Sequence, residues 1–367
     1  MYLGQYGKRY DIDPEVKASG TYGDIYYGTD TDGKEVAIKV MKLNEDTFKI
    51  KDIYENYLSN YVKCNLSNVS CLIDIIRTRD SKYGLVFDRM DGDLENYFEI
   101  NKRPSPPQIN SIICQTLWGL SSIHMVGFAH QDIKPANILT KRLEDGSTYA
   151  EISDLDTICS EIFLRPCYTH ATRNYIPPEW EENMRIYGNN GYWQYAEDKY
   201  SAMLGDSWAL GASYYYLLTG RHLWDVLRRK NKLGNRYRNF DLNELLQDYE
   251  PVYKTAVYVI KELCSTKGTR KLPLEVYMKL RQNPPADLAG CDNEIAMNSF
   301  LLVSLIYSFI MAGNKPFHEI LNEATAIKEE FGINLSEEGA RRQIETRGWL
   351  MDEVSWNNFL DIIRFLG

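Results

Sequence analysis

The run His130 to Asn137 constrains the fold of this chain more than any other feature. It reads His-Gln-Asp-Ile-Lys-Pro-Ala-Asn and places a carboxylate, an ammonium group and an amide within six residues, on Asp132, Lys134 and Asn137. Seventeen residues after Asn137 comes Asp154, in Ser153-Asp154-Leu155-Asp156. Any one of these side chains alone is typical of a protein surface. Together they match what phosphoryl transfer needs: a proton acceptor, a cation and oxygen ligands for magnesium.

We assign the roles accordingly. Asp132 is expected to accept the proton of the attacking hydroxyl, and Lys134 to offset charge on the transferred group. Asn137 and Asp154 are the expected metal ligands, through amide and carboxylate oxygens that suit Mg²⁺, with Mn²⁺ as an alternative.

A glycine-bearing stretch, Ala18 to Ile25, precedes this cluster by about a hundred residues. Gly20 and Gly23 let backbone N–H groups approach phosphate oxygens closely, although the same pattern also occurs in ordinary hairpin turns. Lys39 follows Gly23 by sixteen residues, inside Val36-Ala37-Ile38-Lys39. We expect an inward-facing lysine there that contacts the phosphates of a nucleotide.

An inward lysine needs a carboxylate partner. Glu55, on a helix predicted over residues 46–62, is the candidate. Glu45 and Asp52 lie nearby, and exposed acids are the commoner case, so the sequence leaves this choice open.

The order of elements predicts an α+β fold with two lobes. Alternating apolar residues indicate strands in the first ninety residues, including a hairpin over 19–28. Asp91-Gly92-Asp93 breaks the pattern, and two short strands are then expected around an Asp145-Gly146 turn. Helices are predicted elsewhere in the second part, at 107–125, 207–218, 242–263, 296–311, 324–331 and 356–366. A cleft between a β-rich part and a helical part is a natural ligand site.

These residues resemble the eukaryotic protein kinase family, over roughly residues 15–225. Gly20 to Gly23 matches its glycine-rich loop, Val36 to Lys39 its third-strand lysine motif and His130 to Asn137 its catalytic loop. Three further segments stand where the family has Asp-Phe-Gly, Ala-Pro-Glu and a buried helix motif: Asp154-Leu155-Asp156, Pro177-Pro178-Glu179 and 206–211. The resemblance implies a serine/threonine protein kinase that uses ATP and Mg²⁺.

The resemblance also implies binding roles for individual residues. Ala18, Gly20, Gly23 and Lys39 would contact the phosphates. The adenine would lie between Ile25, Ala37 and Leu139, and the backbones of Asp88 and Met90 would hydrogen-bond its edge. Asp93 could reach the ribose, and Phe87 would be the gatekeeper. In the other half, Thr172 would lie near Asp132 and Lys134, and Glu179 would pair with a later arginine, for which Arg281 is a guess.

Three positions depart from the family pattern: Ala18, Gln131 and Asp156 replace a glycine, an arginine and a glycine respectively. Gln131 has no charge to offer a phosphate. For Asp156 two interpretations stay open, a neutral change at a solvent-facing position and a functional change in a segment where glycine would adopt positive φ. Residues 180–205 are longer than usual for the family.

The resemblance divides the chain into an N-lobe at 1–90, a hinge at about 88–92, a C-lobe at 91–320 and a helical extension at 321–367. A net charge of −9 disfavours nucleic-acid binding driven by overall charge. Protein substrates and ATP are the expected partners, without membrane association. Seven dispersed cysteines and no apolar leader favour a reducing, cytoplasmic compartment, with the nucleus also open, and suggest no disulfide framework. A pseudokinase and a small-molecule kinase are the alternative functions.

Overall fold

The structure is a computed structural model that describes residues 1–20, 22–42, 68–101, 104–125, 128–159, 172–180, 199–230, 241–266, 268–285, 287–288, 299–312, 316–346 and 351–367. By its internal contacts the chain forms two compact units. The first comprises Met1–Ile100 and Ala136–Asp156, and the second comprises Asn101–Pro135 and Thr157–Gly367.

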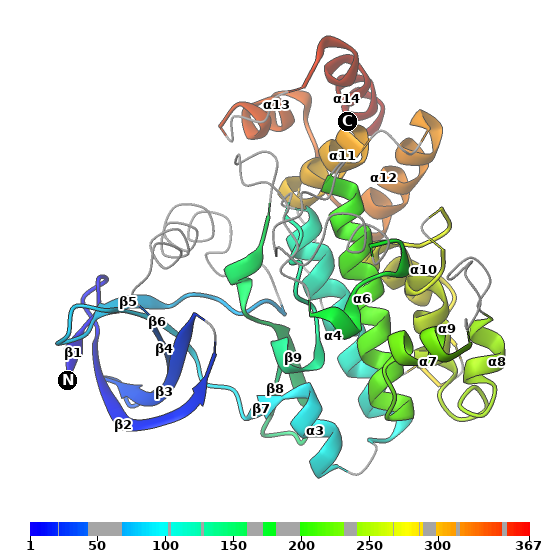
Figure 1. The fold of residues 1–367 in the computed structure, drawn as a ribbon. Helices are drawn as coiled ribbons and strands as arrows, with labels where there is room; N and C mark the ends of the chain where they lie inside the picture. Colours follow the sequence, from blue (N-terminus) through cyan, green and yellow to red (C-terminus); the bar gives the residue numbers. More distant parts are fainter. Residues whose placement is uncertain are drawn as a thin grey trace. The chain divides into compact units, whose positions relative to one another are not determined.

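The first unit is built on a six-stranded sheet with the order β1-β2-β3-β4-β6-β5 (Figure 1). Its strands are β1 (Tyr2–Leu3), β2 (Arg9–Ser19), β3 (Gly23–Asp30), β4 (Glu35–Met41), β5 (Asp74–Arg77) and β6 (Tyr83–Asp88). All neighbours pair antiparallel, and β2 and β3 form the predicted hairpin. Side chains that alternate along the strands fill the interior with Tyr10, Val36, Ile38, Ile76 and Val86.

The first residues of the chain, which include the end strand β1, contact both β2 and the other end strand of this sheet, β5. Leu3 pairs with Arg9 of β2, while Gly4 forms an antiparallel bridge with Ile76 of β5. A Cβ on Gly4 would lie 2.0 Å from Oδ2 of Asp74, so only glycine allows this approach. The Asp74 carboxylate in turn accepts hydrogen bonds from the Tyr6 amide at 3.1 Å and the Tyr10 hydroxyl at 3.0 Å.

A smaller sheet completes the first unit. Its strands are β7 (Gly92–Asp93), β8 (Ile138–Arg142) and β9 (Thr148–Ile152), and helix α3 (Leu94–Ile100) follows β7. The β8–β9 hairpin turns at Gly146, which has a φ of +83°. Glycine adopts this conformation with little strain. The expected turn and its two strands are therefore confirmed, although the first strand, β8, begins at Ile138 and not at Ile133, where the sequence predicts its start.

Helices make up the second unit. The bounds are α4 (Pro106–Met125), α6 (Lys199–Thr219), α7 (Leu223–Lys230), α8 (Leu242–Leu246), α9 (Lys254–Leu263), α10 (Pro273–Gln282), α11 (Ser299–Ala312), α12 (Phe317–Phe331), α13 (Glu337–Thr346) and α14 (Glu353–Leu366). Almost every residue of α4 after its first turn is buried, and α4 packs against α9, α10 and α11.

One expected helix is wrong. Residues 242–263 do not form a single helix but two, α8 and α9, with turns between them that contain Pro251. Proline lacks the amide hydrogen that a helix interior needs, and its ring clashes with the preceding turn.

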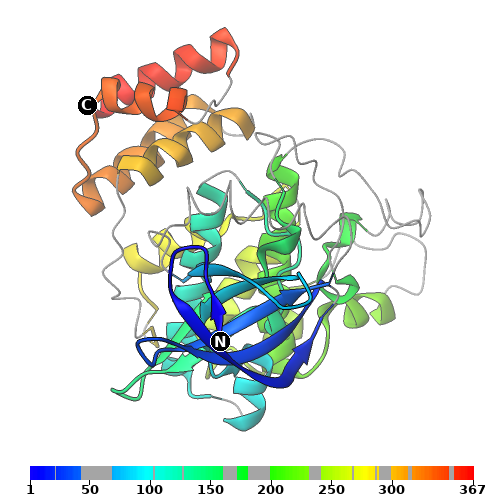
Figure 2. The ribbon, with the colours of Figure 1, turned by 90° about the vertical axis from the view of Figure 1, so that its left-hand side faces the viewer.

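The last four helices lie together, as the orange and red ribbons in Figure 2 show. Helix α11 contacts α12, α13, α14 and also α4, which explains why its sequence is apolar around its whole circumference. None of the described helices is long and apolar enough to cross a membrane. The helix expected over 296–311 is observed as α11.

The cysteines correct another expectation. Cys114 and Cys159 are each in a disulfide bond, whereas Cys71 and Cys264 are not. Spacing along the chain does not reveal which thiols the fold brings together, so the sequence could not show this. The cysteines therefore no longer argue for a reducing compartment.

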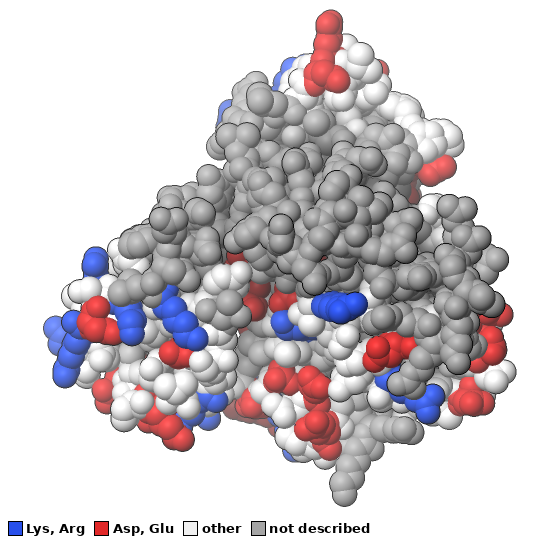
Figure 3. Space-filling view, in the orientation of Figure 1, with Lys and Arg blue, Asp and Glu red and all other residues white. Residues whose placement is uncertain are grey.

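On the face drawn in Figure 3, basic and acidic side chains are interspersed over the described residues.

Candidate active site

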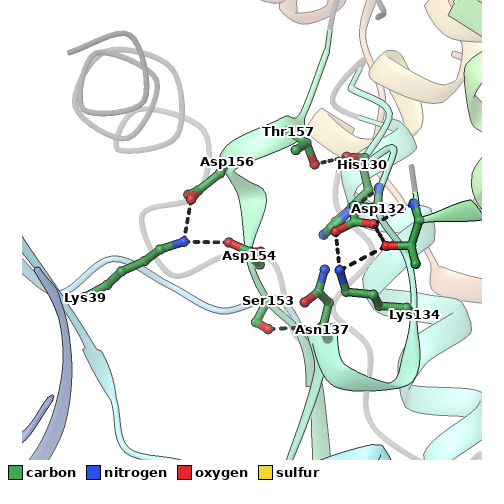
Figure 4. Close-up of polar contacts among 10 residues, drawn as sticks. Lys39, His130, Asp132, Lys134, Asn137, Ser153, Asp154, Asp156 and Thr157 are labelled. Carbon is green, nitrogen blue, oxygen red and sulfur yellow. Dashed lines mark hydrogen bonds and ion pairs between the residues drawn. The ribbon is translucent and has the colours of Figure 1, made fainter. Parts of the chain in front are cut away.

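Lys39 is the centre of a charged cluster in the first unit (Figure 4). It stands on β4, and its side chain is 13% exposed. Its ammonium group contacts two carboxylates, Oδ1 of Asp154 at 2.6 Å and Oδ2 of Asp156. Burial alone would lower the pKa of Lys39, but the attraction of Asp156 and Asp154 outweighs it, so the pKa is raised. The lysine is therefore inward-facing and charged, as the sequence predicted.

Asp156 is not a neutral change at a solvent-facing position, and it does not have positive φ. Its side chain is fully buried, so it is not a change at a solvent-facing position. The described non-glycine residues with positive φ include Asp154 and Gln131, at 60° and 71°, but not Asp156. The conformational freedom of glycine is therefore not what this position needs. Position alone could not reveal that the carboxylate points at Lys39.

The two expected metal ligands lie close together in the chain's fold. Asn137 ends a short 3-10 helix, Pro135–Asn137, and its carbonyl accepts hydrogen bonds from the Ser153 amide at 2.9 Å and the Ser153 hydroxyl at 3.0 Å. Asp154 follows directly, and its side chain is 34% exposed. The described residues contain no cluster of three or more His, Cys, Asp or Glu side chains that could hold a metal ion. One amide and one carboxylate oxygen nevertheless fit Mg²⁺, which binds few protein ligands and completes its shell with phosphates and water.

Asp132 is held by three donors in the second unit. Its Oδ1 accepts hydrogen bonds from the amide of Thr172 at 3.1 Å and from the Thr172 hydroxyl at 2.7 Å. Its Oδ2 accepts one from Nζ of Lys134 at 2.6 Å, and Lys134 also donates to the Thr172 hydroxyl at 3.1 Å. The predicted proximity of Thr172 to Asp132 and Lys134 is confirmed.

A buried carboxylate shapes the backbone before Asp132. Asp206, on α6, accepts hydrogen bonds from the amides of His130 at 2.6 Å and Gln131 at 2.8 Å. It also lies 2.9 Å from Nε2 of His124 on α4. Asp206 thus fixes the strained turn in which Gln131 has positive φ.

The glycine-bearing stretch forms the turn between β2 and β3. Ala18 pairs with Ile25, and the Gly20 amide donates to the Gly23 carbonyl at 2.8 Å. A Cβ on Gly23 would lie 2.8 Å from the Val40 carbonyl oxygen, which explains the glycine at that position. Nζ of Lys42 donates to the Gly20 carbonyl at 2.6 Å and so ties the turn to the end of β4.

The residues expected around the adenine come from both sheets of the first unit and from the segment after β6. Ala37 pairs with Phe87, and Leu139 pairs with Asp93. Met90 is buried, whereas the Asp88 carboxylate contacts Nζ of Lys34. Their roles in nucleotide binding remain predictions.

Arg270 corrects the guessed partner of Glu179. Two hydrogen bonds join Arg270 to Glu179, whereas Nη1 of Arg281 contacts the Tyr277 hydroxyl at 3.5 Å. Arg281 lies on α10, and Arg270 lies in the turn before it. The expected arginine was therefore the wrong one. Glu55, the expected partner of Lys39, lies outside the described residues.

Comparisons with known proteins agree with this geometry. Residues 18–278 match the protein kinase domain family. A probable cell division protein kinase of Encephalitozoon cuniculi is 29% identical over 218 residues, which are 59% of this chain and 74% of that protein. The rat serine/threonine-protein kinase ICK is 33% identical over 168 residues, 44% of this chain but only 25% of that protein.

Solved structures show the same fold. One chain of the CAK complex from Chaetomium thermophilum, solved with bound ATP-γ-S, superposes with a TM-score of 0.57 at 18% identity. The match covers 76% of this chain and 94% of that one. Since the family match extends over more than half of the residues, this chain belongs to the protein kinase domain family.

Proposed function

We propose that this protein transfers the γ-phosphoryl group of ATP to serine or threonine hydroxyls of other proteins. The observation that carries the proposal is the arrangement of Asp132, Lys134 and Thr172, in which one carboxylate, one ammonium group and one hydroxyl contact each other in pairs. Relatives named as serine/threonine kinases support the choice of hydroxyl.

Asp132 accepts the proton of the substrate hydroxyl in this reaction. Because the amide and hydroxyl of Thr172 hold Oδ1 and Lys134 holds Oδ2, the carboxylate has a fixed orientation before substrate arrives. The ammonium group of Lys134 lies 2.6 Å from Asp132, which accepts the proton. Lys134 is therefore placed to offset negative charge on the transferred group.

Asn137 and Asp154 are proposed to hold Mg²⁺, or Mn²⁺ in its place, with ATP as the phosphate donor. The metal would neutralise charge on the phosphate oxygens. Lys39 is the cation proposed to contact the phosphates, and the turn at Gly20 and Gly23 is proposed to cover them. A glutamate at position 55 remains a proposed further partner of Lys39.

The adenine is proposed to lie against Ile25, Ala37 and Leu139, next to the backbones of Asp88 and Met90, with Asp93 near the ribose. The proposed division of the chain is an N-lobe at 1–90, a C-lobe at 91–320 and an extension at 321–367. We propose a cytoplasmic location, with the nucleus also open, on the basis of the family alone.

Radiolabelled ATP and a generic basic protein test the proposal, with wild type compared with Asp132→Asn. The amide is isosteric with the carboxylate but a poor proton acceptor, so transfer should fall by at least about a hundredfold while ATP binding stays nearly unchanged. Phosphoamino-acid analysis should give phosphoserine and phosphothreonine. ATP binding without any transfer by wild type would indicate a pseudokinase, and phosphotyrosine as the main product would refute the substrate class.

A further inference from the structure

Two carboxylates share one ammonium group in the first unit, and they differ in exposure. Lys39 contacts both Asp154 and Asp156. The Asp154 side chain is about one-third exposed, at 34%, whereas that of Asp156 is fully buried. Only one of the two is therefore open to a ligand that arrives from solution.

Asp156 needs a cation at close range. An ionised carboxylate that is buried without a cation nearby is strongly destabilising, and Lys39 is a cation that the structure places against Asp156. Its short 3-10 helix, Leu155–Thr157, begins with Leu155, which is 2% exposed. The burial of Leu155 anchors the segment that carries Asp156.

Under the proposed function, Asp154 also coordinates the metal ion. A carboxylate that coordinates a metal ion has less negative charge to offer a neighbouring ammonium group. Among the described residues, Lys39 would then depend on Asp156 for its orientation. The family places a glycine at the position of Asp156, so no carboxylate is available there in its usual members.

From these contacts we propose that Asp156 is a positioning residue for phosphoryl transfer, which holds Lys39 toward the phosphates while Asp154 serves the metal. The inference rests on the proposed kinase function. It gives Asp156, two positions after the proposed metal ligand Asp154, the role that a glutamate on a helix has in the family.

Asp156→Asn tests this with a change that keeps the shape of the side chain and removes its charge. The kcat should fall by about tenfold or more, because Lys39 is no longer held in the metal-bound state, while the KM for the protein substrate changes little. Asp156→Glu should recover part of the lost kcat, and Asp156→Gly should not. Asp248→Asn, at an exposed position beyond α8, is the matched control and should match wild type.

A binding measurement separates positioning from a merely structural role. The Kd of ATP is measured by calorimetry for wild type and Asp156→Asn, in EDTA and again with magnesium. Without metal, Asp154 still contacts Lys39, so the two proteins should agree within about twofold. With magnesium, the variant should bind ATP about fivefold more weakly.

The outcomes distinguish the two proposals. If wild type is active, Asp132→Asn is inactive and Asp156→Asn equals wild type in kcat, the role of Asp156 is overturned and the kinase function stands. An equal loss of ATP affinity with and without magnesium would also overturn it. If wild type transfers no phosphate, both proposals fail.

Discussion

Arg270 holds Glu179 through two parallel hydrogen bonds, from Nη1 to Oε1 at 2.6 Å and from Nη2 to Oε2 at 3.1 Å. The Arg270 side chain is only 1% exposed, and its guanidinium lies 4.9 Å from the ring centroid of Trp208. Arg270→Ala would leave Glu179 without its cation and remove the packing on Trp208. We expect the free energy of unfolding to fall by about 3 kcal/mol or more, measured by urea denaturation.

The control for this change is Arg342→Ala. Arg342 pairs with Glu338 on the surface of α13, where both side chains are largely exposed, and such pairs contribute at most about 1 kcal/mol. Equal losses in the two variants would contradict the structural role of Arg270.

Thr172 is expected to set the rate through its hydroxyl. Thr172→Val removes the group that bridges Asp132 and Lys134 but keeps the size of the side chain. We expect kcat to fall by about tenfold, the effect of one hydrogen bond to a charged group, while the KM for ATP stays the same. Thr172→Ser should retain most activity, and Thr325→Val on α12 should have no effect. Wild-type turnover in Thr172→Val would refute this.

Because Gln131 is uncharged, we expect the kinase activity not to depend on phosphorylation between Asp154 and Glu179. Its side chain is buried and uncharged, and its Nε2 has no hydrogen-bond partner in the described part of the structure. It therefore cannot bind a phosphate as an arginine does. Purified enzyme treated with a phosphatase should keep its kcat. A large loss, traced by mass spectrometry to that segment, would contradict the prediction.

Glu151 is expected to make stability depend on pH. Burial, opposed by a hydrogen bond from Ser70 and reinforced by Asp88, raises the pKa of Glu151 to about 7. The folded protein then holds this proton over a pH range in which the unfolded chain has released it. Stability is thus lost as pH rises from about 4.5 to about 7.

The variant Glu151→Gln tests this, since it removes the buried charge. At pH 8 it should be more stable than wild type by about 1–3 kcal/mol, and the difference should shrink toward pH 5 in thermal unfolding. Glu144→Gln, at an exposed position in the β8–β9 turn, should show no such trend. A constant difference at both pH values would mean that Glu151 does not titrate in this range.

Local patterns allowed much of the fold to be predicted from the sequence. Alternating apolar residues identified β4, and the helical stripe from Ile109 onward identified α4. The helix expected over 242–263 failed because its apolar period continues past Pro251, where the backbone cannot stay helical. Hydrophobic periodicity predicts which residues of a helix are buried, but it predicts less accurately where the helix begins and ends.

The site was predictable where its residues are close in the chain. Asp132, Lys134 and Asn137 lie within six residues, so their spacing alone indicated their chemistry. Arg270 lies 91 residues from Glu179, and no local pattern chooses it over Arg281. The contact of Asp156 with Lys39 spans 117 residues and depends on tertiary packing that the sequence does not display.

The bridge between Gly4 and Ile76 also bears on how this protein meets other chains. It covers the outer side of β5 at the point where another strand could otherwise add by backbone hydrogen bonds. At the other end of the sheet, the two-residue strand β1 pairs with β2 only at Tyr10 and Arg9. Beyond these residues β2 carries Pro14, irregular register with β3 and an ion pair of Asp13 with Lys17 at 3.1 Å, all of which hinder strand addition. Association through extension of the six-stranded sheet is therefore disfavoured on both sides, and we expect this unit to bind partners through its side chains.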